Sequence, residues 1–449
     1  MAASGPLSKR DFAALMVPLG PFESNPRIAV ALSGGCDSLA LSVLAHDWVQ
    51  ARGGEVIALT VDHRLRAGST AEARRVHAQC VEIGISHHIL TRRGPKPEAS
   101  IQDAARRARY ALLTDWCRDN GVLHLFLGHH LEDQAETFLL RLSRGSGIDG
   151  LSAMTPVQAR AEIRLLRPLL TVPKARLRAV LEKRKLSWIE DPSNLDPNYA
   201  RIRFRRALPM LAEEGLDVAR LAATATRMAR ARTALENLTA GVLAQAVSVF
   251  PEGYGLVKAE ILGRADEEIA LRALSRILMC IGARPYPPRL APLERLYDAL
   301  RSGKPGTAKT LAGCRIIPLD GKNRGGERLL LICREPAAAS ERIELKDSGA
   351  LLWDGRFKIT WKKGKGGPSK PVGRLCLARL GRDGWVQALK IAPSLRDNPL
   401  PYPARLALPA LWRGKKLLAV PHLELSALSP KNPRFELLEA VFSPPSPLV

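Results

Sequence analysis

At about 150 residues per domain, the chain of 449 residues predicts about three domains. Its 46% hydrophobic residues can form real cores, but no run approaches the roughly 18–20 apolar residues of a membrane span, which excludes an integral membrane protein. Lys and Arg (68) outnumber Asp and Glu (44), and the net charge of +24 predicts a polyanionic partner bound by the folded surface.

The first part of the chain predicts a short helix followed by alternating strands and helices. The apolar segment 12–22 is interrupted by prolines and lacks a clear cleavage site, so we expect a capping helix rather than a signal peptide. Apolar runs at 28–32, 56–61, 88–90 and 122–127 are separated by helix-length segments. This β-α-β rhythm predicts an α/β domain with a doubly wound parallel sheet, buried on both faces.

A loop of small residues, Ser-Gly-Gly-Cys-Asp-Ser at 33–38, joins the first strand to an apolar helix. Small residues let backbone amides approach a phosphate, and the helix N-terminus adds its positive end, so the loop predicts a nucleotide site. It is neither a Walker A loop nor a dinucleotide fingerprint. A tight turn capped by Asp37 or Ser38 is the structural alternative.

A helix predicted from about residue 100 carries basic side chains. Arg106 and Arg109 lie three apart and so share a face, and arginine is suited to a bidentate grip on phosphate. We interpret Arg107 as part of a solvated face.

The fourth apolar run leads into a helix with acidic residues. Gly128 and His129 follow this strand, and because ligands collect at the carboxyl ends of parallel strands, we expect them beside the phosphate loop. His129, Asp133 and Glu136 are spaced to share one helix face. The two carboxylates predict a site for a cationic substrate or a metal. For Glu132 we favour a role at the helix dipole, and His130 is left open between the two.

The rest of the chain predicts two further domains. Long helices with apolar residues seven apart follow from about residue 216 to 300, and the apolar run 329–332 and the segment 336–340 mark a boundary. Short strand-like runs predominate from residue 341 onward. We therefore expect a catalytic domain at 1–214, a helical domain at 215–335 and a small α+β domain at 341–449.

A dense group of basic side chains lies near the end of the first predicted domain. It comprises Arg201, Arg203, Arg205 and Arg206. Such a group predicts contacts to RNA phosphates, which give salt-dependent affinity with little base specificity.

Several motifs occur together in a fixed order. They are residues 33–38, 61–66, 105–110 with 129–137, the small-residue loop 144–154, and 166–170 with 188–203. The first resembles the pyrophosphate loop of the ATP pyrophosphatases, and together they resemble the tRNA(Ile)-lysidine synthase family. The last motif is the most discriminating. The resemblance is close over about residues 25–210 and loose in the segments 306–316 and 408–420.

The resemblance implies a fold, a reaction and its partners. The fold is adenine nucleotide α-hydrolase-like, and the reaction joins free L-lysine to carbon 2 of the wobble cytidine of a CAU-anticodon tRNA(Ile). ATP adenylates the tRNA, pyrophosphate and then AMP leave, and the lysidine formed changes codon reading from AUG to AUA. ATP and magnesium are the implied cofactors. The oligomeric state, a homodimer included, is left open.

The resemblance also implies roles for single residues. ATP would be bound by Ser33, Gly34, Gly35, Cys36, Asp37 and Ser38, with Cys36 as a spacer and Asp37 also reaching magnesium. Arg109 and His129 would join Asp37 as catalytic residues by stabilising charge at the α-phosphate. Asp133 and Glu136 would bind the lysine amines.

Three other functions fit the sequence less well. A pyrophosphate-loop tRNA thiolase needs a cysteine pair or cluster ligands, but the seven cysteines are scattered and include no CxxC pair. The same scatter argues against a structural zinc site and favours a reducing cytoplasm. A small-molecule amidating ligase does not explain the charge of +24. A non-catalytic RNA-binding protein would not need the phosphate loop together with Arg109, His129 and both carboxylates.

Overall fold

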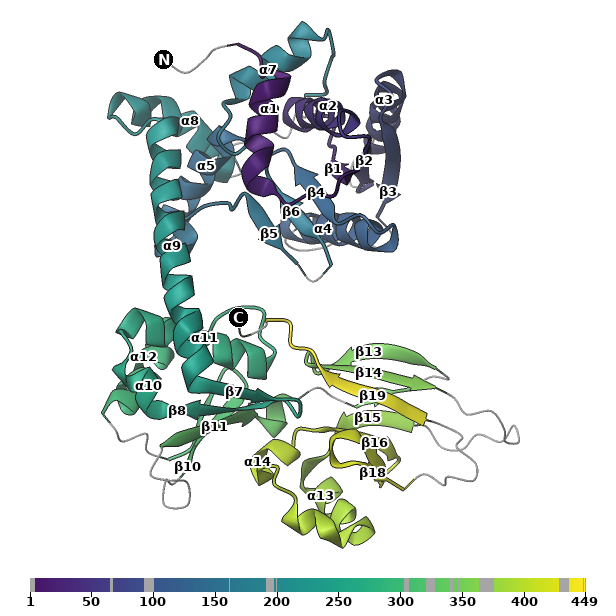
Figure 1. Ribbon diagram of the computed structural model, residues 1–449, viewed down its shortest axis with the longest axis vertical. Coiled ribbons are helices and arrows are strands. Elements are labelled where there is room, and N and C mark those ends of the chain that lie inside the picture. The colour runs from purple at the N-terminus through teal and green to yellow at the C-terminus, as the bar shows by residue number, and fades with distance from the viewer. Residues whose placement is uncertain are drawn as a thin grey trace, which may run out of the picture. The chain divides into compact units, whose positions relative to one another are not determined.

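The computed structural model describes residues 5–64, 68–92, 101–160, 162–190, 198, 200–302, 307–319, 328–339, 342–345, 348–362, 375–427, 436–446 and 448. Parts of the predicted motifs, residues 65–66, 191–194 and 306, lie outside these ranges. The chain forms two compact units, Met1–Thr233 and Ala234–Val449, and the boundary falls within helix α9 (Val218–Ala246) (Figure 1). The division into three domains stays a prediction. Within the described ranges, no helix is both long and apolar enough to cross a membrane.

The first unit is built on a six-stranded sheet in the order β3-β2-β1-β4-β6-β5. Its strands are β1 (Arg27–Ala31), β2 (Glu55–Asp62), β3 (Ser86–Thr91), β4 (His124–Leu127), β5 (Val157–Ala159) and β6 (Arg164–Leu166). All neighbours pair in parallel except β5, which runs antiparallel to β6 at the edge. The prediction of a doubly wound, mostly parallel sheet is confirmed.

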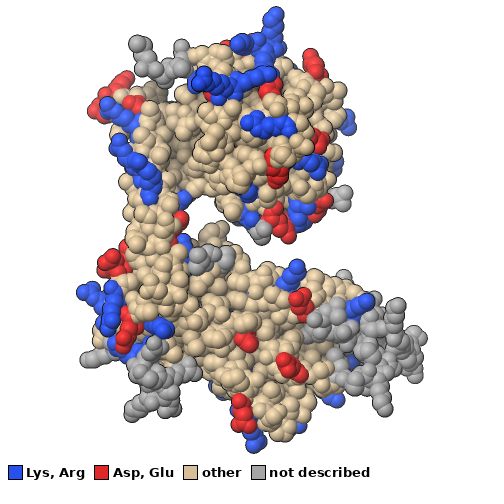
Figure 2. Space-filling model, in the orientation of Figure 1, with Lys and Arg blue, Asp and Glu red and all other residues tan. Residues whose placement is uncertain are grey.

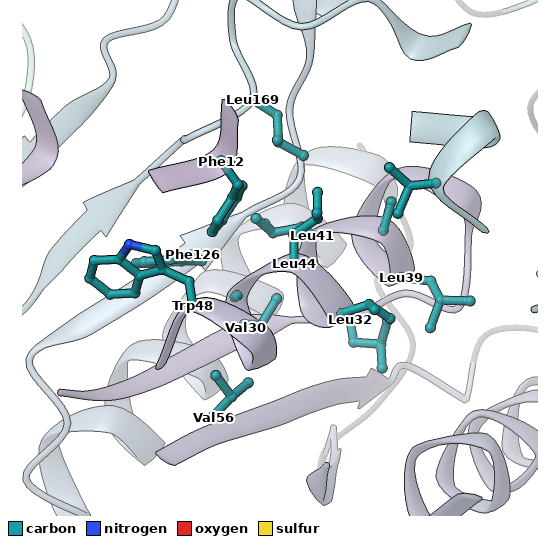
Figure 3. Packing of buried hydrophobic residues seen from close by; sticks show 14 of the residues in the cluster. Phe12, Val30, Leu32, Leu39, Leu41, Leu44, Trp48, Val56, Phe126 and Leu169 are labelled. Atoms are coloured by element: carbon teal, nitrogen blue, oxygen red, sulfur yellow. The ribbon is translucent and has the colours of Figure 1, made fainter. Parts of the chain in front are cut away.

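Helices cover both faces of this sheet, as alternate residues of β1 show. Ile28 and Val30 pack into a core with α1 (Lys9–Met16), α2 (Cys36–Gln50) and α7 (Lys174–Lys183) (Figure 3). Ala29 and Ala31 face a second core that includes Leu113 and Cys117 of α4 (Ile101–Asp119). Each large aliphatic side chain buried in this way stabilises the fold by about 1.5–3 kcal/mol. Strand β1 is therefore held firmly on both sides where it leads into the loop 33–38.

The remaining helices of the unit flank the sheet. They are α3 (Ser69–Glu82), α5 (Leu131–Leu142), α6 (Ile148–Leu151) and α8 (Ala200–Glu213). Helix α5 packs through Phe138 and Leu139 against Leu208 of α8 and Leu221 of α9. The expected N-terminal helix is α1, which begins with a capping box: the Asp11 amide donates to the Ser8 hydroxyl, and the Ser8 amide to the Asp11 carboxylate.

The second unit contains a sheet that the sequence analysis did not predict. Five antiparallel strands lie in the order β7-β8-β11-β10-β9. They are β7 (Val247–Phe250), β8 (Tyr254–Lys258), β9 (Lys309–Leu311), β10 (Cys314–Leu319) and β11 (Leu329–Arg334), packed with α10 (Ala259–Arg264), α11 (Glu267–Gly282) and α12 (Leu290–Arg301). The apolar run 329–332, expected at a boundary, instead forms the central strand β11, because residues 330–334 are buried on both faces.

The short strands expected beyond residue 341 form two antiparallel sheets, in the orders β12-β15-β16-β17-β18 and β13-β14-β19. Their elements are β12 (Ile343–Glu344), β13 (Gly349–Trp353), β14 (Phe357–Lys362), β15 (Leu375–Arg379), α13 (Gly381–Ile391), α14 (Tyr402–Arg405), β16 (Pro409–Arg413), β17 (Lys416–Val420), β18 (Leu425–Ser426) and β19 (Glu436–Phe442). Residues of β8, β11, α13 and β16 share one hydrophobic core.

A buried ionic cluster links β11 to the turn between β13 and β14. The Asp354 carboxylate accepts from Arg334 Nε at 3.0 Å and from Arg356 Nε at 2.8 Å. Burial raises the pKa of Asp354, but the two guanidinium groups outweigh this and hold that pKa below its ordinary value. The carboxylate therefore stays ionised inside the unit.

Candidate active site

A pocket of about 870 Å³ opens at the carboxyl ends of β1 and β4. The two strands are hydrogen-bonded neighbours, with Ala31 opposite Leu127, so the segments that follow them lie side by side. The loop 33–38 lines one wall, and Gly128 and His129 line another. The structure thus places both predicted motifs at one site, where the strand order reverses.

Hydrogen bonds within the loop fix its shape. The Ser33 amide donates to the Ser38 hydroxyl at 3.1 Å, and the Ser33 and Ser38 hydroxyls lie 3.0 Å apart. The Ser38 hydroxyl also donates to the Gly35 carbonyl. The loop leads directly into α2, whose first-turn amides have no partner within the helix. Such a preformed turn suits an anionic ligand.

Two glycines permit the close packing around the loop. Gly34 has φ +82°, and a Cβ there would lie 2.7 Å from Val76. A Cβ at Gly128 would lie 3.1 Å from both the amide nitrogen and the Cα of Ser38. The close approach of the end of β4 to the start of α2 is therefore favoured by the absence of a side chain at position 128.

A charged cluster adjoins the loop at the start of α5. His130 Nε2 lies 3.5 Å from Asp37 Oδ2 and 3.5 Å from Asp133 Oδ2, while its Nδ1 lies 2.9 Å from Glu132 Oε2. Lys174 Nζ approaches the same Asp37 oxygen at 3.7 Å. Sequence reasoning left His130 open and assigned Glu132 to the helix dipole, and it did not single out Lys174.

The cluster controls the ionisation of its members. Burial lowers the pKa of His130, but its hydrogen bonds to Asp37 and Glu132 outweigh burial and raise that pKa to about 10. Burial raises the pKa of Asp37, but His130 and Lys174 together bring it below its ordinary value. At neutral pH the cluster therefore contains an imidazolium and an ionised Asp37.

The opposite side of the pocket is basic. Arg106, Arg109 and His129 all line it, and Arg167 and Arg201 add their charge around the same histidine. Burial, reinforced by these four arginines, lowers the pKa of His129 to about 3. His129 is therefore neutral, and its Nδ1 is buried without a hydrogen-bond partner among the described residues. This side suits a phosphate, with the arginines supplying the positive charge.

Helices α5 and α8 are joined by two polar contacts. Glu136 is fully buried, and its Oε1 accepts from Arg205 Nε at 2.7 Å. One turn earlier, Arg201 donates to the Thr137 hydroxyl at 3.2 Å. Arg205 also lines the pocket. Of the predicted basic group, Arg201 and Arg205 thus contact α5, while Arg203, Arg205 and Arg206 are all exposed. Arg203 also donates to the Asn198 carbonyl at 3.0 Å.

The segment 186–190 forms a further wall. The Ile189 amide donates to the Gly34 carbonyl at 2.9 Å, and Trp188 and Glu190 line the pocket together with Arg178. Sequence reasoning recognised the motif around Trp188 without giving its residues a role. Their position follows from the backbone bond to the loop, a tertiary contact that local sequence does not reveal.

The cysteines do not form a redox or metal site. All seven lie in the described ranges without disulfides, and burial raises the pKa of six of them; Cys36, beside Asp37, reaches about 11. Within the described parts of the chain, no three His, Cys, Asp or Glu side chains are grouped as metal ligands. Burial thus favours the protonated thiol in these six cysteines at neutral pH.

The net charge is spread over the folded surface. On the face shown in Figure 2, Lys and Arg side chains lie over both units, and Asp and Glu side chains lie among them. This agrees with a surface, rather than a tail, that carries the charge of +24.

Comparisons with known proteins cover both units. A family model described as a PP-loop domain matches residues 6–211. The tRNA(Ile)-lysidine synthase of Ruegeria pomeroyi is 37% identical over 402 residues, which cover 89% of this chain and 90% of that protein. The enzyme of the same name from Bradyrhizobium diazoefficiens is 38% identical, with 72% and 98% covered. That from Rhodopseudomonas palustris is 42% identical, with 70% and 92% covered.

Proposed function

This chain belongs to the tRNA(Ile)-lysidine synthase family and is an enzyme that forms lysidine in tRNA(Ile) with ATP. We propose that it does so in two steps at the pocket at the carboxyl ends of β1 and β4. First, the carbonyl oxygen at carbon 2 of the wobble cytosine attacks the α-phosphate, and pyrophosphate leaves. Next, the ε-amine of lysine bonds to that carbon, and the oxygen departs with AMP. The similarity over 89% of the chain carries this proposal.

The loop 33–38 and the N-terminus of α2 would bind the β- and γ-phosphates. Support comes from the preformed turn and from the closeness of Gly128 to Ser38, which leaves backbone rather than side chains at the surface of the loop. The first-turn amides and the positive end of the helix favour a multiply charged anion.

The residues fit a magnesium ion that accompanies ATP. Asp37 Oδ1 is buried and has no hydrogen-bond partner among the described residues, while Oδ2 is held by His130 and Lys174. Magnesium is usually bound by one or two carboxylates together with substrate phosphates, so one carboxylate oxygen that has no other partner is sufficient. When bound there, the ion would neutralise charge on the departing pyrophosphate.

Arg109 and His129 would act at the α-phosphate. The arginines of this wall supply the positive charge for the pentavalent transition state. Neutral His129 would contribute a hydrogen bond rather than a charge, because its pKa of about 3 excludes an imidazolium at neutral pH.

Asp133 and Glu136 would bind the amines of lysine. Asp133 is partly exposed beside His130, and the second oxygen of Glu136, Oε2, is buried without a partner in the described parts of the chain. A buried carboxylate oxygen without a hydrogen-bond or ionic partner costs free energy. Such an oxygen therefore favours a cationic ligand.

The exposed arginines of α8 would contact tRNA phosphates. The exposure of Arg203 and Arg206 supports this role; Arg205 is also exposed, although it donates to Glu136, and Arg201 donates to Thr137. Adenylation requires the wobble base to leave its stack and enter the pocket, so the RNA contacts must adjoin it.

One labelling experiment tests the proposal. The purified protein is incubated with ATP, magnesium and labelled lysine, with a CAU-anticodon tRNA(Ile), the methionine tRNA of the same anticodon, or no RNA. We expect label only in the isoleucine tRNA, at its wobble base. Pyrophosphate release that depends on tRNA but gives no label would mean that lysine is not the nucleophile.

A further inference from the structure

One ring nitrogen of His130 lies near two carboxylates, of which only Asp37 lines the pocket. Its Nε2 lies 3.5 Å from a carboxylate oxygen of Asp37 and equally 3.5 Å from one of Asp133. Asp37 lies in the first turn of α2, and Asp133 lies in the first turn of α5. His130 is only 2% exposed, so water does not compete for these contacts.

The other ring nitrogen of His130, Nδ1, contacts a third carboxylate. Nδ1 lies 2.9 Å from Glu132 Oε2, and the Glu132 carboxylate also accepts the Lys174 amide, at 3.0 and 3.1 Å. Lys174 Nζ then returns to Asp37 Oδ2 at 3.7 Å. The contacts form a closed ring through three segments: the loop, the start of α5 and the start of α7.

This ring distinguishes the two oxygens of Asp37. Oδ2 is in contact with both His130 and Lys174, whereas Oδ1 is buried without a partner among the described residues. A carboxylate held at one oxygen has little freedom to rotate, so the other oxygen is presented in a fixed direction. When a residue that orients a metal-binding side chain in this way is replaced, the affinity for the metal typically changes about 10- to 100-fold.

We propose that His130 is a positioning residue, which fixes the carboxylates of Asp37 and Asp133 relative to each other by contacting both through one nitrogen. The nucleotide and lysine are then bound in one relative geometry. Lys174 supports Asp37 alone. The identity of the two ligands rests on the proposed function. The structural alternative is a buried polar cluster that only stabilises the fold. The two interpretations differ in what a conservative replacement does.

Two amide variants separate the nitrogens of the ring. In His130→Gln the side-chain nitrogen falls near Nε2 and keeps a donor for Asp37 and Asp133, whereas in His130→Asn it falls near Nδ1 and serves only Glu132. MgATP binding is measured by calorimetry without tRNA, in the presence and absence of magnesium. We expect His130→Asn to weaken MgATP binding by about 10- to 100-fold, and His130→Gln to remain close to the wild type.

The lysine Michaelis constant and a matched control complete the test. His130→Asn should also raise the lysine KM, whereas Lys174→Met should weaken MgATP binding and leave the lysine KM unchanged. His124→Asn is the control, because His124 is similarly buried, lies 2.9 Å from Glu23 Oε2 and begins β4, whereas the pocket lies at the carboxyl end of that strand. It should lower the melting temperature without changing MgATP affinity.

Two results would overturn the positioning role: equal defects in His130→Gln and His130→Asn, or MgATP affinity in His130→Asn that matches the wild type. Failure of the proposed function is seen separately, as wild-type protein that forms no lysidine. The ranking of the variants in MgATP binding does not depend on that outcome.

Discussion

At the scale of single residues, the site depends on a position that has no side chain. Gly128 follows β4 and lies against the first turn of α2, where a Cβ would come within 3.1 Å of the Ser38 backbone, so that a methyl group would require this backbone to move by a few tenths of an ångström. The neighbouring atoms belong to the backbone and cannot rotate away. The shape of the phosphate loop is therefore linked to the identity of residue 128.

We predict that Gly128→Ala weakens ATP binding by about tenfold or more, equivalent to about 1.4 kcal/mol, because the added methyl group displaces Ser38. Calorimetric titration with ATP measures this. Gly241→Ala is the matched control: a Cβ there meets nothing within 4 Å, and alanine favours the helix by about 1 kcal/mol. Unchanged ATP affinity in Gly128→Ala would show that the loop tolerates displacement.

Asp133 and Glu136 of α5 give a second prediction at this scale. Asp133→Asn and Glu136→Gln should raise the lysine KM by about 10- to 100-fold, since a hydrogen bond to a charged group is worth about 1.5–3 kcal/mol. The ATP KM should change less. Steady-state kinetics with each substrate varied in turn measures both constants. The reverse ranking would assign these carboxylates to a metal instead.

At the scale of elements, helix α8 has two different sides. Arg201 and Arg205 contact α5 through Thr137 and Glu136, while Arg203 and Arg206 are exposed. Arg205 is exposed as well. One helix thus supports α5 and presents charge at the surface.

We predict that Arg203→Ala combined with Arg206→Ala weakens tRNA binding and reduces the slope of log affinity against log salt by about one to two, since about one counterion is released per phosphate contact. ATP binding without tRNA should be unchanged. Filter binding over a salt series measures the slope. The Lys double variant keeps both charges and should retain the wild-type slope. A loss of affinity with an unchanged slope would argue against phosphate contacts.

Elements of the first unit were more predictable than those of the second for physical reasons. A parallel sheet brings the ends of β1 and β4 to one edge, so Ser33, Gly128 and His129 could be placed together from sequence. The roles of His130 and Lys174 depend on α7 meeting the loop, a contact that no local pattern encodes. Strand β7 follows α9 directly, with no Gly or Pro between them. The sequence pattern therefore predicts that this segment is part of the helical region.

At the scale of the whole molecule, the second unit is stabilised by its own buried ionic cluster. The second unit buries Asp354 between Arg334 and Arg356, which are 6% and 1% exposed. Removing the shared carboxylate would leave two buried guanidinium groups without their anion. That cost falls on the second unit and leaves the pocket of the first unit intact.

We predict that Asp354→Asn destabilises the second unit by about 3–5 kcal/mol at pH 7. Because the folded pKa lies below the ordinary 3.8, the stabilisation is complete above that value and is lost as the pH falls through the folded pKa. The wild type and the variant should therefore converge in acid. Amide hydrogen exchange in β13 and β14 measures the difference, which distinguishes the two units. A difference that persists unchanged in acid would contradict the ionic explanation.

The burial of the thiols has a practical consequence for labelling the protein. Six cysteines are buried, and their raised pKa values keep them protonated and unreactive toward alkylating reagents at neutral pH. Cys376, on β15 in the second unit, is partly exposed. A thiol-reactive fluorophore should therefore attach at this one position of the unmodified sequence. A fluorophore there would report on the surroundings of β15 in the second unit.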